Sequence, residues 1–182
     1  MTELEMMRWI LGILITAGAL AVAVMYFLRN DVAPALEADG AADGAGNDRG
    51  RLQLALMSYS KNAESTIPSS ILESDVYEAI QQSIRQCSIM IESSPIWDEL
   101  EKTVLQSCPK FKSNMYVLAG GDLKQSDLQM ALLIKCGVSP ANIATLVGRS
   151  KSTITFRRKD MGRKLFDREM DANSVDRLIR LI

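Results

Sequence analysis

A run of 20 uncharged residues near the N-terminus constrains the fold of this chain more than any other feature. Residues 9–28 read WILGILITAGALAVAVMYFL. A helix of this length is about 30 Å long, which matches the hydrocarbon thickness of a bilayer. A buried core helix would carry a polar stripe, and a signal peptide would carry a basic leader where this chain has Glu3 and Glu5. We therefore expect a retained single transmembrane helix over 9–28, after a short tail over 1–8.

The basic residues around this run favour one orientation in the membrane. Arg8 precedes the run, whereas Arg29, Arg49 and Arg51 follow it. Because Lys and Arg are enriched on the cytoplasmic side of membrane helices, this count favours an external N-terminus. The expected location is the cell inner membrane, with a single pass and a cytoplasmic C-terminal domain.

The next segment, 30–50, is predicted to be a flexible linker. Ala, Gly and Asp make up 14 of the 20 residues in 31–50. Such a composition cannot bury an apolar face and is typical of a hydrated tether.

Residues 51–120 are predicted to form a helical connector region. Apolar residues recur there at helical spacing and no strand pattern is convincing, so the fold class outside the membrane is expected to be all-α. Ser74 is the expected N-cap of one helix. The apolar stripes of this region are predicted to be core: Val76, Ile80, Ile84 and Cys87 in one helix, then Trp97, Leu100, Val104 and Cys108, and finally Phe111, Met115 and Leu118.

Composition excludes several classes of function. The chain has no His, so His-based catalysis is excluded, and the distant cysteines Cys87, Cys108 and Cys136 form no metal-binding pair. Two Ser-x-x-Lys matches, at 58–61 and 107–110, lack any supporting motif. We expect no enzyme activity, no metal site and no cofactor. The 62 residues of 121–182 hold 12 Lys or Arg against 7 Asp or Glu, which favours an anionic partner at this end.

Residues 121–182 have the spacing of a helix-turn-helix domain. Asp122 or Ser126 is the expected cap of a first helix, Ser139 precedes a short second helix, and Ser150 caps a third helix that begins at residue 151. Gly148 lies where the turn needs a positive φ. The residues expected to form the motif core are Ile143, Ala144, Val147, Gly148, Ile154, Met161 and Leu165.

This segment resembles the LuxR-type helix-turn-helix family without a gap. Lys124, Asp127 and Arg157 replace the usual Thr, Glu and His, respectively. The wider stretch 70–182 is similar to the C-terminal region of Bacteroidetes membrane-anchored helix-turn-helix regulators. The resemblance implies a DNA-binding domain over 121–182. The matching positions are Leu123, Asp127, Gly137, Ser139, Ile143, Ala144, Val147, Ser150, Thr153, Ile154, Lys164 and Leu165.

The third helix is predicted to place one face in the major groove of DNA. With Ile154 at the centre of the buried face and 100° per residue, the residues expected to face out and contact bases are Ser152, Thr155, Phe156, Lys159 and Arg163. The flanking cations expected to contact phosphates are Arg149, Lys151, Arg157, Arg158 and Lys164. A solvated cationic helix face is the alternative interpretation.

Three functions remain open at this stage. The favoured one is a membrane-tethered transcriptional regulator that binds double-stranded DNA, as a homodimer because single units rarely bind tightly. The alternative is a membrane-anchored adaptor that docks another regulator, a sensor protein or the anionic membrane surface. A region similar to the DNA-binding end of a sigma factor is a third possibility. The closing stripe of Val175, Leu178, Ile179 and Ile182 is either the last wall of the domain or a dimer face.

Overall fold

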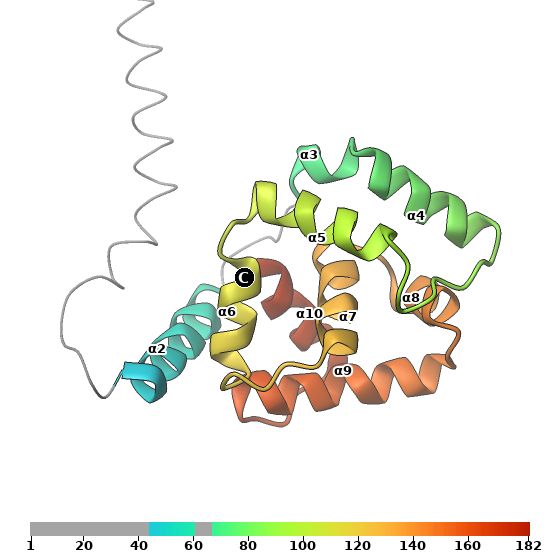
Figure 1. Cartoon of the computed structure of the whole chain (residues 1–182). Helices are drawn as coiled ribbons and strands as arrows, with labels where there is room; N and C mark the ends of the chain where they lie inside the picture. The colour runs from blue at the N-terminus through green and yellow to red at the C-terminus, as the bar shows by residue number, and fades with distance from the viewer. Residues whose placement is uncertain (1–43, 61–66) are drawn as a thin grey trace, which may run out of the picture. The chain divides into compact units, whose positions relative to one another are not determined.

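The computed structural model describes residues 44–60 and 67–182, and within these ranges all regular secondary structure is helical. The expectation of an all-α fold is therefore confirmed for this part of the chain (Figure 1). The helices are α2 (Gly44–Tyr59), α3 (Ser69–Leu72), α4 (Asp75–Arg85), α5 (Ile96–Ser107), α6 (Phe111–Leu118), α7 (Gln125–Lys135), α8 (Pro140–Val147), α9 (Lys151–Phe166) and α10 (Ala172–Leu181).

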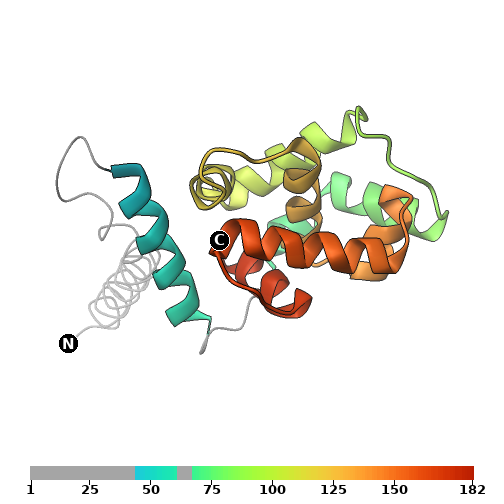
Figure 2. The same cartoon turned by 90° about the horizontal axis from the view of Figure 1, so that it is seen from below.

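Helix α7 is the centre of the core. All of its residues from Leu128 to Lys135 are buried, because α5 and α10 pack against it. Helix α9 packs on α10 and on α8. In Figure 2, which shows the helices from below, α9 lies at the front. In the closing stripe, Val175, Leu178 and Ile179 are buried, and Ile182 is partly buried against the core. This stripe is thus a wall of the domain, and the alternative of a free dimer face is wrong for it.

Serine caps fix the starts of three helices, as the sequence predicts. The side chains of Ser74, Ser139 and Ser150 each accept a hydrogen bond from a backbone N–H of the first turn of α4, α8 and α9, respectively. The expected cap of α7 is wrong. That helix begins at Gln125 with Lys124 as its uncapped N-cap residue. Ser126 therefore lies inside the first turn, where it cannot act as N-cap, and Asp122 lies two residues before the cap.

The predicted linker is also wrong over its last residues. Helix α2 begins at Gly44, and its Arg49 side chain is packed against other helices. The three glycines of 44–50 disfavour a helix by themselves, so the contacts that Arg49 makes with the rest of the fold stabilise this part of α2. The tail 1–8, the apolar run 9–28 and the linker up to residue 43 lie outside the described residues. Among the described residues, no helix is long and apolar enough to cross a membrane.

The connector stripes are confirmed except at Cys87. Trp97, Leu100 and Val104 are buried on α5, next to the buried side chains of α6. Cys87 lies beyond the end of α4, with a φ of 51°, and is exposed, so it is not part of that stripe. Cys108, the C-cap residue of α5, is half-buried and packs against the core as predicted.

Gly162 allows α9 and α10 to approach closely. A Cβ atom at this position would overlap Val175 Cγ2 and would lie 3.2 Å from Met170 Cγ. We expect Gly162→Ala to lower the free energy of unfolding by about 1–3 kcal/mol through overpacking, as measured by urea denaturation. Gly46→Ala is the matched control, since nothing lies within 4 Å of a Cβ there, and it should cause no loss. Equal stability of the two variants would contradict the close packing.

Candidate nucleic-acid interface

Helices α8 and α9 are joined by the tight turn that a helix-turn-helix requires. Gly148 has φ 64° and ψ 38°, a left-handed conformation that favours glycine. The N–H of Arg149 donates to Ala144 O at 2.9 Å, which closes the end of α8. Of the expected motif core, Ile143, Ala144, Ile154, Met161 and Leu165 are buried and Val147 is half-buried, while Gly148 is exposed at the turn.

The opposite face of α9 is exposed. All five residues predicted to contact bases lie on it, namely Ser152, Thr155, Phe156, Lys159 and Arg163. Phe156 is 64% exposed, in contrast to the buried Phe111 and Phe166. The ring therefore lies on the same exposed face as the other residues predicted to contact bases.

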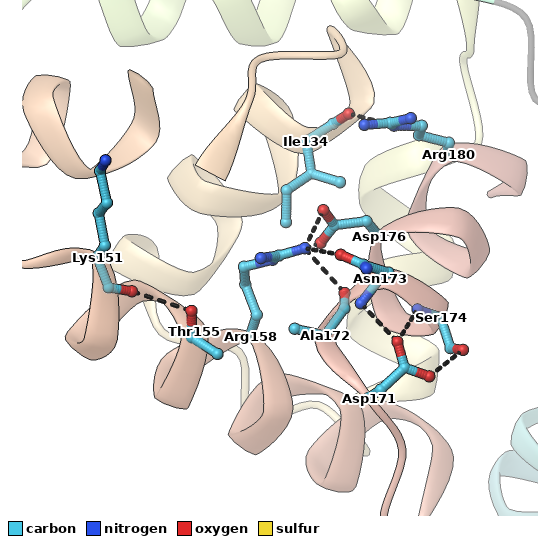
Figure 3. A network of polar contacts seen from close by, with 10 residues as sticks. All are labelled: Ile134, Lys151, Thr155, Arg158, Asp171, Ala172, Asn173, Ser174, Asp176 and Arg180. Carbon is cyan, nitrogen blue, oxygen red and sulfur yellow. Dashed lines mark hydrogen bonds and ion pairs between the residues drawn. The ribbon is translucent and has the colours of Figure 1, made fainter. Parts of the chain in front are cut away.

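Hydroxyl groups gather at the N-terminal end of α9. The Ser150 hydroxyl lies 2.8 Å from those of Ser152 and Thr153, and it accepts the Thr153 N–H at 3.1 Å. One turn later, Thr155 Oγ1 donates to Lys151 O at 3.0 Å (Figure 3). Because its proton is engaged, Thr155 offers its methyl group and oxygen lone pairs to a ligand.

The five cations expected to flank this face lie in different environments. Arg149 and Lys151 are exposed at the turn and at the start of α9. Arg157 is turned towards α7, where it donates to Ser126 Oγ at 2.8 Å and to Asp127 Oδ1 at 3.1 Å. Lys164 is half-buried and lies 3.4 Å from Asp122. The structure thus leaves Arg149 and Lys151 as the best placed of the five to reach phosphates.

The expectation for Arg158 is wrong, because its side chain is buried. Its Nε donates to Asp176 Oδ1 at 2.7 Å, and its Nη2 donates to Asp176 Oδ2 and to Ala172 O (Figure 3). The helical period explains this position, since Arg158 follows Ile154 by four residues and therefore shares its buried face. The cation serves the packing of α9 on α10 and is not available to a phosphate.

Separate hydrogen bonds join α10 to α7 close to this ion pair. Burial raises the pKa of Asp176, and the Arg158 guanidinium opposes that rise. On the same helix, Arg180 Nε donates to Ile134 O at 3.2 Å, and Lys135 Nζ donates back to Arg180 O at 2.7 Å. Burial lowers the pKa of Lys135. The ion pair thus joins α9 to α10, and the Arg180–Ile134 hydrogen bond joins α10 to α7 (Figure 3).

Acidic side chains lie near the C-terminal half of the exposed face. Arg163 is 3.5 Å from Asp160, one turn earlier on α9. A shallow depression there is lined by Lys159, Arg163, Glu169, Met170 and Asp171. The positive character of the face is therefore strongest at the N-terminal end of α9.

Two contacts with the motif were not predicted from the sequence. The loop 86–95 packs against the turn, because Met90 N–H donates to Leu146 O at 2.7 Å and Ile89 lies against Gly148. Arg49 of α2 reaches the last turn of α9, where it donates to Lys164 O. No local signal marks these contacts, since each joins residues that are more than 50 positions apart.

Comparison with known proteins finds no matching family model, no matching curated protein and no matching solved structure. Within the described residues, no group of three or more Cys, Asp or Glu side chains could hold a metal ion.

The buried ion pair leads to a stability prediction. Arg158→Met leaves the Asp176 carboxylate buried without its cation, and we expect a loss of about 3–5 kcal/mol in the free energy of unfolding. The double variant Arg158→Met/Asp176→Leu removes both charges and should recover most of that loss. Urea denaturation followed by the fluorescence of the buried Trp97 measures both. An unchanged stability of Arg158→Met would contradict a structural role.

Proposed function

We propose that the chain is a DNA-binding transcriptional regulator that reads the major groove with helix 151–165. The observation that carries this proposal is the exposed face of α9, on which Phe156 lies among hydroxyl groups and cations. The other face of the same helix is anchored by the buried Arg158–Asp176 pair. A rigid helix with one free, chemically mixed face is the arrangement with which helix-turn-helix proteins read base edges.

Each group on the exposed face of α9 suits a feature of the major groove. The groove is about 12 Å wide, and an α-helix with its side chains measures about 10–12 Å. Lys159 can donate to guanine O6 and N7, and the engaged hydroxyl of Thr155 leaves a methyl group and lone pairs for a base edge. Phe156 can contact a thymine methyl group.

Phosphates on either side of the groove are the natural partners of the exposed cations. Arg149 lies at the end of the turn, and Lys151 is the first residue of α9. The first turn of α9 contains no acidic residue. Phosphate contacts of this kind orient a protein on the duplex without reading sequence. In this assignment Arg157 acts indirectly, because it ties α9 to α7 through Asp127.

The proposal includes a membrane tether and a dimer. The apolar run 9–28 would hold the regulator at the cell inner membrane, with residues 44–182 in the cytoplasm, where DNA is found. Two copies would read two half-sites about one helical turn apart.

One observation favours the alternative of a protein adaptor. Ile89 and Ile91 are 63% and 71% exposed on the loop 86–95. That loop is held by hydrogen bonds, among them Trp97 Nε1 to Ile91 O at 2.9 Å and Gln129 Nε2 to Glu92 O at 3.0 Å. Two exposed isoleucines on a loop held in place would suit an apolar contact with a protein partner.

The first test is selection from a pool of random duplexes with the full chain. We expect enrichment of a sequence with two half-sites, and its loss in Thr155→Ala/Lys159→Ala, because both substitutions remove groups that would contact bases. Lys102→Ala/Gln106→Ala is the matched control, since it also removes one exposed cation but lies on α5. It should leave the enriched sequence unchanged.

Salt dependence separates the phosphate contacts from the base contacts. We expect Arg149→Ala/Lys151→Ala to reduce the slope of log affinity against log salt by about 2, at roughly 0.9 per phosphate. The enriched sequence should stay the same. Weak, salt-insensitive binding without any enriched sequence in the unsubstituted chain would contradict the regulator and favour the adaptor.

Reporter fusions after Ile182 test the proposed topology. A reporter that is active only in the cytoplasm should be active when fused at this position, and a reporter that is active only outside the cell should be silent. The reason is that most of the basic residues around the apolar run lie on its C-terminal side, which favours a cytoplasmic C-terminus. Activity of the external reporter would place the helix-turn-helix away from DNA and end the proposal of a tethered regulator.

A further inference from the structure

Helix α2 supplies hydrogen bonds to the ends of two other helices. Arg49 Nε donates to Leu118 O at 2.7 Å, at the end of α6. The same guanidinium donates to Lys164 O at 2.9 Å, and Gln53 Nε2 donates to Leu165 O at 2.7 Å. Two side chains, one helical turn apart on α2, thus reach the C-terminal ends of α6 and α9.

These contacts satisfy carbonyl groups that α9 cannot satisfy itself. The last four carbonyls of an α-helix have no partner within the helix. In α9 the N–H of Asp167 bonds to Arg163 O at 2.9 Å, and the next two carbonyls, of Lys164 and Leu165, accept from α2. The cation at this end also interacts favourably with the helix dipole.

Asp167 makes the end of α9 depend further on α2. It is the C-cap residue of α9 in a left-handed conformation with φ 52°, which is uncommon for a non-glycine residue. Its carboxylate places a negative charge at the negative end of the helix dipole, an unfavourable position. Arg49 lies 2.9 Å from Oδ1, and Gln53 donates to Oδ2 at 3.2 Å. The contacts from α2 thus offset an unfavourable charge.

The attachment of α2 is nevertheless small. Over its residues 46–59, Leu56 is the one buried side chain, while Leu52 and Met57 are partly buried against the core. Leu54 and Tyr59 are 66% and 61% exposed. With so little apolar area covered, the polar contacts of Arg49 and Gln53 form a large share of what holds α2 in place.

We propose that α2 is a releasable cap of the recognition helix. When α2 is docked, it completes the ends of α6 and α9 and holds the last turn of α9 rigid. When α2 is displaced, the carbonyls of Lys164 and Leu165 lose their partners, the end of α9 frays, and the affinity for DNA falls. The loss of DNA affinity rests on the proposed function, whereas the fraying of α9 does not.

The position of α2 in the sequence would let such a cap respond to events near the N-terminus of the chain. It begins at residue 44, directly after the segment that joins it to the apolar run 9–28. A force, a ligand or a protein that acts on that preceding segment reaches α2 before any other part of the fold. The cap then converts an event upstream into a change at the DNA-reading helix.

Hydrogen exchange of the full chain in detergent micelles tests the cap without reference to DNA. We expect Arg49→Ala/Gln53→Ala to speed exchange roughly tenfold in peptides covering residues 163–170, as the last turn opens. Peptides from the start of α9 should be unchanged. The control Asn47→Ala/Ser58→Ala changes exposed positions of α2 and should have no effect. Unchanged exchange in the Arg49/Gln53 variant would overturn the proposal.

Substitution of Asp167 distinguishes a cap from a surface ion pair. Asp167→Gly removes the carboxylate and adopts the left-handed conformation readily. In that background, Arg49→Ala should still speed exchange at residues 163–170, since the carbonyl contacts remain to be lost. No further change would mean that Arg49 acts only on Asp167, which would overturn the cap. Arg49→Lys keeps the charge without the planar fork, and it should speed exchange nearly as much as Arg49→Ala.

DNA binding by the same variants completes the test. If the unsubstituted chain selects a sequence, Arg49→Ala/Gln53→Ala should weaken binding several-fold with the same sequence preference. Equal affinity would overturn the link between the cap and DNA. If the unsubstituted chain binds no DNA, the proposed function fails, while the exchange result still decides whether α2 caps α9.

Discussion

The buried pair of Arg158 and Asp176 is the contact on which the presentation of α9 depends. It joins two helices that lie next to each other in sequence and in space, and both side chains are almost fully removed from water. A charge in this position is costly unless it is paired. The pair therefore favours one rotation of α9 about its axis, and with that rotation Ile154, Met161 and Leu165 point inwards. The rotation that buries these residues also determines which side chains of α9 lie on its exposed face.

The two ends of α9 are secured in different ways, and this difference matters for function. The N-terminal end is self-contained, because Ser150 caps it and Gly148 turns the chain into it from α8. The C-terminal end depends on α2, more than 100 residues earlier in the sequence. Among the proposed DNA-reading residues, Ser152, Thr155 and Phe156 lie towards the secure end, whereas Arg163 lies in the dependent last turn. Displacement of α2 would therefore affect the C-terminal end of α9 and leave its N-terminal end in place.

Local signals in the sequence predicted the motif well. The caps Ser139 and Ser150 and the left-handed Gly148 depend on interactions within four residues, so spacing alone identifies them. Predictions that needed distant partners were less successful. Charge favoured a phosphate contact for Arg158, although the helical period placed it on the buried face, and Asp176 on an otherwise apolar stripe was the signal that could have corrected this. The three glycines among the seven residues of 44–50 gave no sign of a helix that other helices stabilise.

The sequence by itself determined where the helices of the motif begin and turn, because caps and glycine conformations are short-range effects. It also determined that the outer face of α9 carries Phe156 among cations and hydroxyl groups, because the 3.6-residue period assigns faces once the apolar positions are known. Only the tertiary structure decided which cations remain available and which are used in packing. It also decided that α2 closes the end of α9. The physical reason is that an ion pair or a capping contact between distant segments depends on where the whole chain places them, and no local pattern encodes that distance.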